Sequence, residues 1–256
     1  MGRKGYVMTF GKVHDPEMHG EYVSKFGPTL GPFGGKLLLK HVFPEVRAAR
    51  SPVASARRLR PAPTAPATAS APTLADAAAR CAQGPAPYAE RTTADDYTYA
   101  VALEFDSVEK AMEWKSSAAY QEIVNLRLDA GKGPLIVAEG VDSEADGLPM
   151  IEDPQAFLCG YIKITDPAVM GYPPKVPATL AGFGGYVMRA IFPKGGGAYH
   201  ERTTKEDFDI GVILGFTSVE KALEWKASAA YQEILPIRLD NSTGPLAIVP
   251  KFAPPS

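Results

Sequence analysis

The chain has 256 residues, of which 45% are hydrophobic and 22% are charged, the composition of a globular protein with room for one large or two small domains. Its formal net charge of −2 gives no bulk electrostatic basis for binding nucleic acid or an anionic membrane. No apolar run approaches the length of a membrane span, and the first residues do not resemble a secretion leader.

The first three elements are predicted from apolar periodicity and from the residues at their ends. Residues 5–13 form a short apolar run, which is typical of a strand. Residues 15–34 begin with aspartate and proline, as helices often do, and this helix is expected to end near Gly27. Residues 35–43 are predicted to form a strand. One face of that strand is expected to carry Leu37, Leu39, His41 and Phe43.

Three further elements follow. Residues 97–105 carry a large apolar side chain at every second position, from Tyr97 to Phe105, which indicates a strand. Asp106 and Glu109 have the spacing of a capping box that opens a helix, and the serines and alanines at 116–119 predict a kink in it. Residues 133–140 read as a last strand opened by Gly-Pro. The resulting order β-α-β-β-α-β is the ferredoxin-like split arrangement.

The chain contains this unit twice. Residues 107–123 read SVEKAMEWKSSAAYQEI, and residues 218–234 read SVEKALEWKASAAYQEI. Residues 88–141 align without a gap on 199–252, and more than half of the aligned positions are identical. Such self-similarity indicates tandem structural units. The predicted boundaries are 1–140 for the first unit, 141–155 for a polar linker and 156–256 for the second unit.

The first unit carries a segment that the second lacks, because the two units align without a gap once residues 46–83 are removed. The segment is rich in alanine and proline and contains arginine but no lysine or aromatic residue. It could be a disordered surface insertion, a basic arm for an anionic partner, or a retained intron. We favour the intron as its origin and disorder as its behaviour, so we expect it to form no part of either core.

The predicted strands need cover on both faces. The stretch 36–43, KLLLKHVF, is apolar on both sides, whereas a sheet with one solvated face should alternate cleanly. The simplest solution is that the sheets of the two units pack against each other. The sequence thus predicts an α+β fold of two tandem ferredoxin-like βαββαβ units that form an intrachain dimeric α/β barrel. This arrangement is a pseudo-dimer within one chain, and it leaves a further homodimer open.

Three motifs resemble a known family. They are the Asp-Pro and tyrosine of 15–22, the glycine pair at 34–35, and Phe-x-Ser-x-Glu-x-Ala-x-x-Trp…Tyr-Gln…Arg at 105–127 and 216–238. They are similar to the family called domain of unknown function 1330, of the dimeric α/β-barrel superfamily. The resemblance implies the same fold, with two copies fused where the family usually uses two chains. It implies little about activity, since superfamily relatives include cofactor-free monooxygenases, haem-degrading enzymes and non-catalytic dimers.

The second unit departs from this pattern. Pro173 and Pro174 stand where the first unit has the region of Tyr22, so the two halves need not be equivalent in function.

The catalytic candidates come from one strand and from one polar cluster. His41 shares a predicted barrel-facing strand and could act as a base, although a hydrogen-bonded core histidine is the alternative. Tyr88 and Glu90 lie just before a strand, where the barrel mouth is expected. The sequence contains no nucleophile triad, metal-ligand cluster, P-loop or dinucleotide motif. We therefore expect no metal and no cofactor.

The ligand-binding candidates are polar residues near the barrel mouth and two helical tryptophans. A glutamate beside an arginine could hold a small polar ligand, with a solvated ion pair as the alternative. The tryptophans could contact a ligand, with core packing as the alternative. These candidates are Arg91, Tyr199, Glu201, Arg202, Trp114 and Trp225.

Four other repeated residues have structural interpretations. Arg127 and Arg238 are expected to stabilise helix C-termini. The hydroxyls of Tyr120 and Tyr231 are expected to bond to the backbone.

Two functions remain, and whether the protein is an enzyme stays open. The first is a structural or small-ligand-binding barrel module with an apolar pocket between its sheets. The alternative is a cofactor-independent monooxygenase or isomerase of the antibiotic-monooxygenase kind. A filled interior favours the module, and a cavity with convergent polar groups favours the enzyme. The only cysteines, Cys81 and Cys159, suit neither a disulfide framework nor a metal site, so we expect a cytoplasmic protein.

Overall fold

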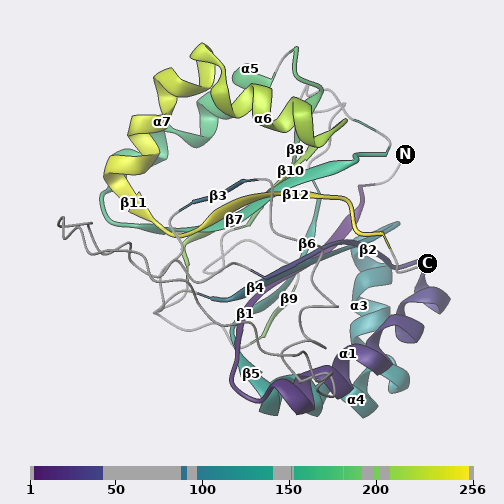
Figure 1. The fold of residues 1–256 in the computed structure, drawn as a ribbon. Coiled ribbons are helices and arrows are strands. Elements are labelled where there is room, and N and C mark those ends of the chain that lie inside the picture. Colours follow the sequence, from purple (N-terminus) through teal and green to yellow (C-terminus); the bar gives the residue numbers. More distant parts are fainter. Residues whose placement is uncertain are drawn as a thin grey trace, which may run out of the picture.

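The computed structural model describes residues 3–42, 88–90, 97–140, 151, 153–180, 182–191, 199–201 and 208–253. These residues form two antiparallel sheets that face each other, with helices on the outer side of each (Figure 1). The predicted insertion, 46–83, and most of the predicted linker, 141–155, lie outside the described residues.

The elements of the first half follow the predicted order. They are β1 (Gly5–Val13), α1 (Pro16–Leu30), the 3₁₀ turn η1 (Gly31–Phe33), β2 (Lys36–Val42), β3 (Tyr88–Glu90), β4 (Tyr99–Phe105), α3 (Val108–Ser116), α4 (Ala118–Ala130), β5 (Gly131–Lys132) and β6 (Leu135–Glu139).

The second half repeats this order with one change, a broken helix after its first strand. Its elements are β7 (Ala156–Ile164), η2 (Pro167–Gly171), η3 (Pro173–Lys175), α5 (Val176–Leu180), β8 (Gly185–Ile191), β9 (Tyr199–Glu201), β10 (Ile210–Phe216), α6 (Val219–Ala227), α7 (Ala229–Asn241), β11 (Ser242–Thr243) and β12 (Leu246–Pro250).

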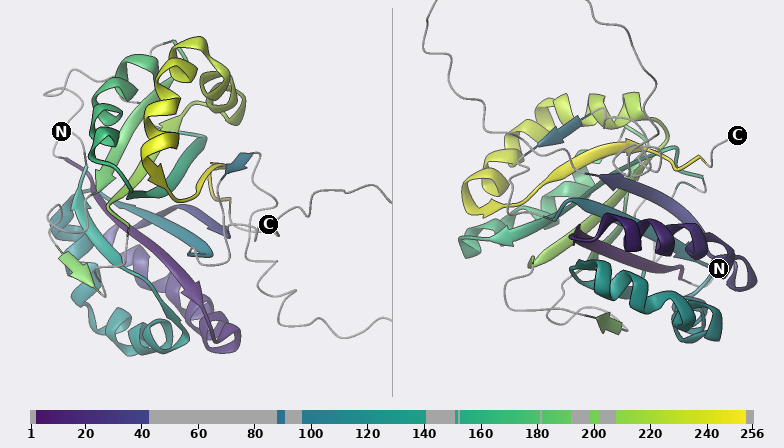
Figure 2. Two further views of the ribbon diagram at one scale, coloured as in Figure 1. Left: turned by 90° about the vertical axis from the view of Figure 1, so that its left-hand side faces the viewer. Right: turned by 60° about the horizontal axis from the view of Figure 1, so that its bottom comes forward.

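Each sheet takes one short edge strand from the other half. The strand order is β2-β4-β1-β6-β9 in the first sheet and β3-β12-β7-β10-β8 in the second. Glu201 of β9 lies opposite Leu135 of β6, and Glu90 of β3 lies opposite Leu246 of β12. Figure 2 (left) shows β9, in green, at the edge of the lower sheet beside the teal helices. The sequence did not predict this exchange.

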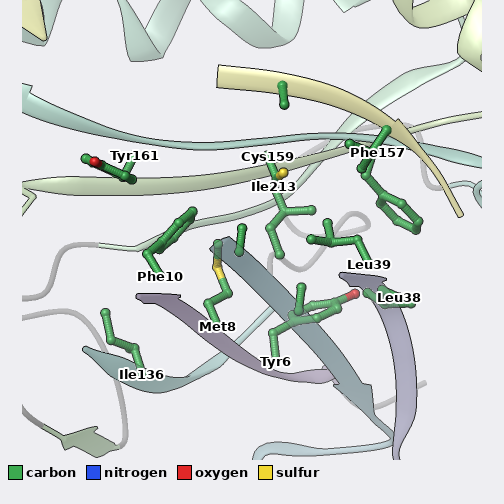
Figure 3. Close-up of a cluster of buried hydrophobic side chains, with 14 of the residues drawn as sticks. Tyr6, Met8, Phe10, Leu38, Leu39, Ile136, Phe157, Cys159, Tyr161 and Ile213 are labelled. Atoms are coloured by element: carbon green, nitrogen blue, oxygen red, sulfur yellow. The ribbon is translucent and has the colours of Figure 1, made fainter. Parts of the chain in front are cut away.

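The space between the sheets is filled by hydrophobic side chains. Phe10 of the first sheet packs edge-on against Tyr161 and Phe208, with ring centroids 5.3 and 5.1 Å apart. Figure 3 shows side chains of both sheets pointing toward one another, among them Met8, Leu39, Cys159 and Ile213. Burying each large apolar side chain stabilises the fold by about 1.5–3 kcal/mol. This packing confirms the predicted face-to-face barrel.

The outer face of each sheet carries larger side chains that pack against the helices. On β4, Ala100 and Ala102 belong to the interior core, whereas Leu103 and Phe105 belong to the helix-facing core. On β2, Leu39 faces the interior and Leu37 packs on the helix side. The prediction that these two leucines share a face is wrong, because a β-bulge shifts the register between them.

The helix ends follow capping chemistry. Asp15 accepts a hydrogen bond from the Met18 amide, as expected for the start of α1. The helix continues past Gly27 to Leu30, because Pro28 removes only one backbone donor in the last turn.

No helix of the described residues combines the length and hydrophobicity that crossing a membrane requires.

The repeated helices begin one residue later than predicted. Ser107, not Asp106, is the N-cap of α3 and accepts from the Lys110 amide, and Ser218 has the same role in α6. The expected kink is a complete break, since Ser117 is extended (φ −65°, ψ 146°) and caps the next helix.

Gly133 fixes how the last strand of the first half meets its neighbour. Its φ of +132° favours glycine, and a Cβ here would lie 2.1 Å from the Phe10 carbonyl oxygen. Gly244 has a φ of +118° and approaches the Tyr161 carbonyl in the same way. The repeated Gly-Pro-Leu sequence therefore encodes the entry into β6 and β12.

Candidate functional site

A buried ionic cluster lies beneath the helices of the first half. It consists of Lys115 on α3, Arg127 on α4 and Glu201 on the exchanged strand β9, and we call it the Glu201 cluster. The Lys115 Nζ lies 2.9 Å from Glu201 Oε2, and the Arg127 guanidinium contacts the other carboxylate oxygen. The three side chains are only 8%, 5% and 13% exposed. Removing such charges from water is costly unless they are paired, so the cluster depends on all three partners.

Two tyrosines complete the surroundings of Lys115. Its ammonium group lies 5.1 Å from the ring centre of Tyr120 and 5.0 Å from that of Tyr199. Cation–π contacts of this kind stabilise a partly desolvated ammonium. The Tyr199 hydroxyl also donates a hydrogen bond to Glu201 at 3.2 Å. Residues of β9 thus hold Lys115 both by charge and by an aromatic face.

The polar environment extends from Arg127 toward α1. Burial raises the pKa of Tyr22 well above its usual value, and the neighbouring Tyr120 raises it further. Burial also lowers the pKa of His19 to about 4, assisted by the charges of Lys40 and Arg127. The His19 ring lies 5.4 Å from the ring of Tyr99. His19 is therefore neutral near pH 7.

Acidification should destabilise the protein partly through His19. The ordinary histidine pKa is about 6.5, so between pH 6.5 and 4 the unfolded chain binds a proton that the folded chain does not. Stability is consequently lost as the pH falls through this window. We expect His19→Gln to reduce the difference between the urea concentrations of half-unfolding at pH 7 and at pH 5. The exposed His14 is the control, and equal slopes for wild type and His19→Gln would contradict the prediction.

An open groove of about 1050 Å³ runs along α3 and α4 and reaches the Glu201 cluster. We call it the α3–α4 groove. Lys115 and Glu201 both line it, so the cluster is accessible from this side. Its apolar wall consists of Val108, Met112, Val124 and Leu128. Its polar lining consists of Glu109, Glu113, Lys115, Ser116, Gln121, Asn125, Tyr199 and Glu201.

The second half preserves part of this arrangement. Lys226 lies 5.3 Å from the ring centre of Tyr231, and Arg238 is fully buried. Tyr231 bonds through its hydroxyl to that of Tyr172 at 3.0 Å. Tyr172, the residue just before Pro173, thus supplies a tyrosine to the second half at this place.

The halves differ most at the helix after the first strand. Pro173 and Pro174 fix the backbone and lack N–H donors, so short 3₁₀ turns replace the first part of a long helix. At this site η2 has no histidine and instead exposes Met170, which is 47% accessible. The first half alone therefore combines a histidine with the cationic pair among the described residues.

The predicted catalytic residues are placed only by their backbones. His41 lies in β2 opposite Ala100, and Tyr88 and Glu90 lie in β3 along β12. Their side chains lie outside the part of the chain that the structure describes, as do Arg91 and Arg202 altogether. Their catalytic or ligand-binding roles remain predictions.

Four other sequence candidates have described side chains. Tyr199 and Glu201 meet Lys115 in the cluster, so Glu201 forms a buried pair rather than a solvated one. Trp114 and Trp225 are completely buried. Their indole N–H groups donate to Thr29 at 3.0 Å and to Thr179 at 2.9 Å, respectively.

The sequence interpretation missed the burial of two cations, Lys115 and Arg127, and gave two tyrosine hydroxyls the wrong partners. Arg127 does lie in the last turn of its helix, but its guanidinium is buried against Glu201. Tyr231 bonds to a side chain instead of the backbone, and the Tyr120 hydroxyl has no hydrogen-bond partner among the described residues. A signal for both cations existed, because Lys115 stands seven residues after Val108 and Arg127 stands seven residues after Tyr120, in register with the buried stripe.

One family model matches most of the chain. A family model described as "Domain of unknown function (DUF1330)" matches residues 67–141 and 155–252. The first match begins inside the segment 46–83 and omits the motifs at 15–22 and 34–35. No curated protein has a matching sequence.

Several solved structures are similar at low identity. A protein from Fusobacterium nucleatum with a provisional monooxygenase assignment is 8% identical, with 98% of this chain and 93% of that chain covered and a TM-score of 0.46. An anthrone oxidase-like protein is 10% identical (99% and 92% covered, TM-score 0.46). A chlorite dismutase variant from Candidatus Nitrospira defluvii is 8% identical (98% and 92% covered, TM-score 0.41). At these values the likeness says nothing about activity.

Proposed function

The chain belongs to the family of the domain of unknown function DUF1330, and we propose that it is a small-molecule-binding α/β-barrel module whose ligand occupies the α3–α4 groove. One observation carries this proposal: Lys115 and Glu201 line an open groove with an apolar wall, and the buried Arg127 contacts the same Glu201 carboxylate. Ligand sites combine apolar lining with a few placed polar groups.

The proposed site differs from the one expected between the sheets. Seventeen buried residues from both sheets and the adjoining loop pack together in the described part of that interior, including Met8, Phe10 and Phe157. This packing favours the outer face, beside α3 and α4, as the location of the ligand. The halves also differ next to this site, because the long helix α1 packs against α4 and carries His19, whereas the short turn η2 of the second half has no histidine.

The described residues give the enzymatic alternative less support. A cofactor-independent monooxygenase or isomerase needs convergent polar groups around an enclosed substrate. The interior polar atoms described here are mainly tyrosine hydroxyls, such as that of Tyr6, whose pKa burial raises.

Methionine methyl resonances can test where a ligand binds. Met112 lines the groove, Met8 lies between the sheets, and Met170 is exposed on the second half. A fragment library screened by thermal shift supplies the ligands, and the protein labelled at its methionine methyl groups reports their location. We expect stabilising fragments to shift the Met112 signal and leave Met8 and Met170 unchanged. A shift at Met8 without one at Met112 would place the ligand in the barrel interior and refute the proposal.

A further inference from the structure

We propose that the α3–α4 groove binds a small monocarboxylate with an apolar body, and that Glu201 is an internal carboxylate which occupies the binding position when the ligand is absent. This inference rests on the proposed function, because it names the ligand class for the same groove. It also gives the exchanged strand β9 a role in controlling access to the site.

The charges of the cluster favour a carboxylate ligand. Lys115 and Arg127 supply two buried cations, whereas Glu201 supplies one carboxylate. The Arg127 Nε is buried and has no hydrogen-bond partner among the described residues. Arginine and lysine bind carboxylates through short charge-assisted hydrogen bonds. The two cations thus suit a carboxylate ligand, and the single carboxylate of Glu201 leaves one of the Arg127 donors without a described acceptor.

The position of Glu201 allows it to be displaced. It lies on the three-residue strand β9, at the edge of the first sheet, where only Leu135, Ile136 and Val137 of β6 pair with it. Short edge strands with few contacts open at a low free-energy cost relative to central strands. Figure 2 shows β9 beside the helices that carry the two cations in both views. A ligand that enters along the groove therefore meets the strand that it must displace.

The remaining lining defines the rest of the ligand. Val108, Met112, Val124 and Leu128 offer an apolar wall for a hydrocarbon body. Glu109 and Glu113 also line the groove and would repel a second negative charge. The ligand should consequently carry one carboxylate and an otherwise uncharged body.

Octanoate and its neutral counterpart octanamide test this ligand class by isothermal titration calorimetry at neutral pH. Glu201→Gln should strengthen octanoate binding roughly tenfold, because an internal competitor lowers the fraction of binding-competent protein. Glu224→Gln changes the net charge equally at an exposed position on α6, away from the groove, and should have little effect. Octanamide binding should not respond to either substitution.

A second pair of variants removes a cation instead of the carboxylate. Lys115→Met leaves Arg127 and Glu201 as a one-to-one pair and should weaken octanoate binding roughly tenfold. Lys226→Met is the matched control, since Lys226 has the same position against Tyr231 in the second half. It should leave octanoate binding unchanged.

The outcomes separate this inference from the proposed function. If both probes shift the Met112 methyl signal with equal affinities in every variant, the groove binds ligands but the carboxylate assignment is wrong. If octanoate binds neither the wild type nor Glu201→Gln, the carboxylate inference is wrong. The fragment screen then decides separately whether the α3–α4 groove binds any ligand. Should Glu201→Gln fail to fold, recovery by refolding with octanoate but not octanamide supports the inference. Equal octanoate affinities of Lys115→Met and Lys226→Met overturn it.

Discussion

Replacing Glu201 by glutamine is expected to destabilise the protein by about 3–5 kcal/mol, since it leaves Lys115 and Arg127 buried without a counter-charge. Differential scanning calorimetry should show this as a fall in Tm of roughly 10 °C. Combining Glu201→Gln with Lys115→Met and Arg127→Met should recover most of the loss, because an apolar replacement of a buried ionic cluster is often neutral.

The exposed Glu113, paired with Lys110 on the surface of α3, is the matched control. Glu113→Gln should change the free energy of unfolding by less than about 0.5 kcal/mol. A Tm for Glu201→Gln equal to that of wild type would show that the buried cluster contributes nothing to joining the halves.

Replacing Trp114 by alanine is expected to cost about 3–5 kcal/mol, because it opens a cavity in a fully buried core. The indole also stacks near Tyr120, with ring centroids 4.2 Å apart, and donates to Thr29. Trp225→Ala should cost a similar amount, since its contacts with Tyr231 and Thr179 repeat this geometry. Urea unfolding monitored by circular dichroism measures both effects.

A conservative variant separates packing from ligand contact. Trp114→Phe retains much of the ring volume and should cost clearly less than Trp114→Ala. Met170→Ala, at an exposed position, should leave stability nearly unchanged. If Trp114→Ala unfolded at the wild-type urea concentration but lost affinity for groove ligands, the tryptophan would be a binding residue and not a packing residue.

The strands and helices could be predicted because their local signals are strong. The apolar run at 5–13 and the alternation around Leu103 depend only on neighbours in sequence, and both became strands. The bulge in β2 could not be predicted from such a local pattern. Three consecutive leucines, Leu37 to Leu39, fit either face, so the sequence does not reveal where the alternation changes.

The exchanged strands β3 and β9 could not be predicted from the sequence, for a different reason. A three-residue strand has almost no pattern of its own, and β9 pairs with β6, which lies far away in the chain. Its partner is decided by the packing of the whole barrel. The Glu201 carboxylate therefore looked like part of a local Glu-Arg pair, when its partners are Lys115 and Arg127 of the other half.

The missed cations show the limit of residue-type expectations. Both Lys115 and Arg127 stand at core positions of their helices, seven residues after Val108 and Tyr120. Charged residues are seldom fully buried, so the position of Arg127 near a helix C-terminus favours a role at the helix end. A cation in register with an apolar stripe is better interpreted as the sign of a buried partner elsewhere in the chain.

The exchange of β3 and β9 also bears on how the protein emerges from the ribosome. The first sheet cannot gain its last strand until residues 199–201 have been translated, although β6 is complete at Glu139. At roughly 5–20 residues per second, the edge of β6 stays open for several seconds of synthesis. An uncovered strand edge invites pairing with other nascent chains. Fusing both halves in one polypeptide supplies the missing strand at high local concentration, which favours pairing within the chain over pairing with another chain.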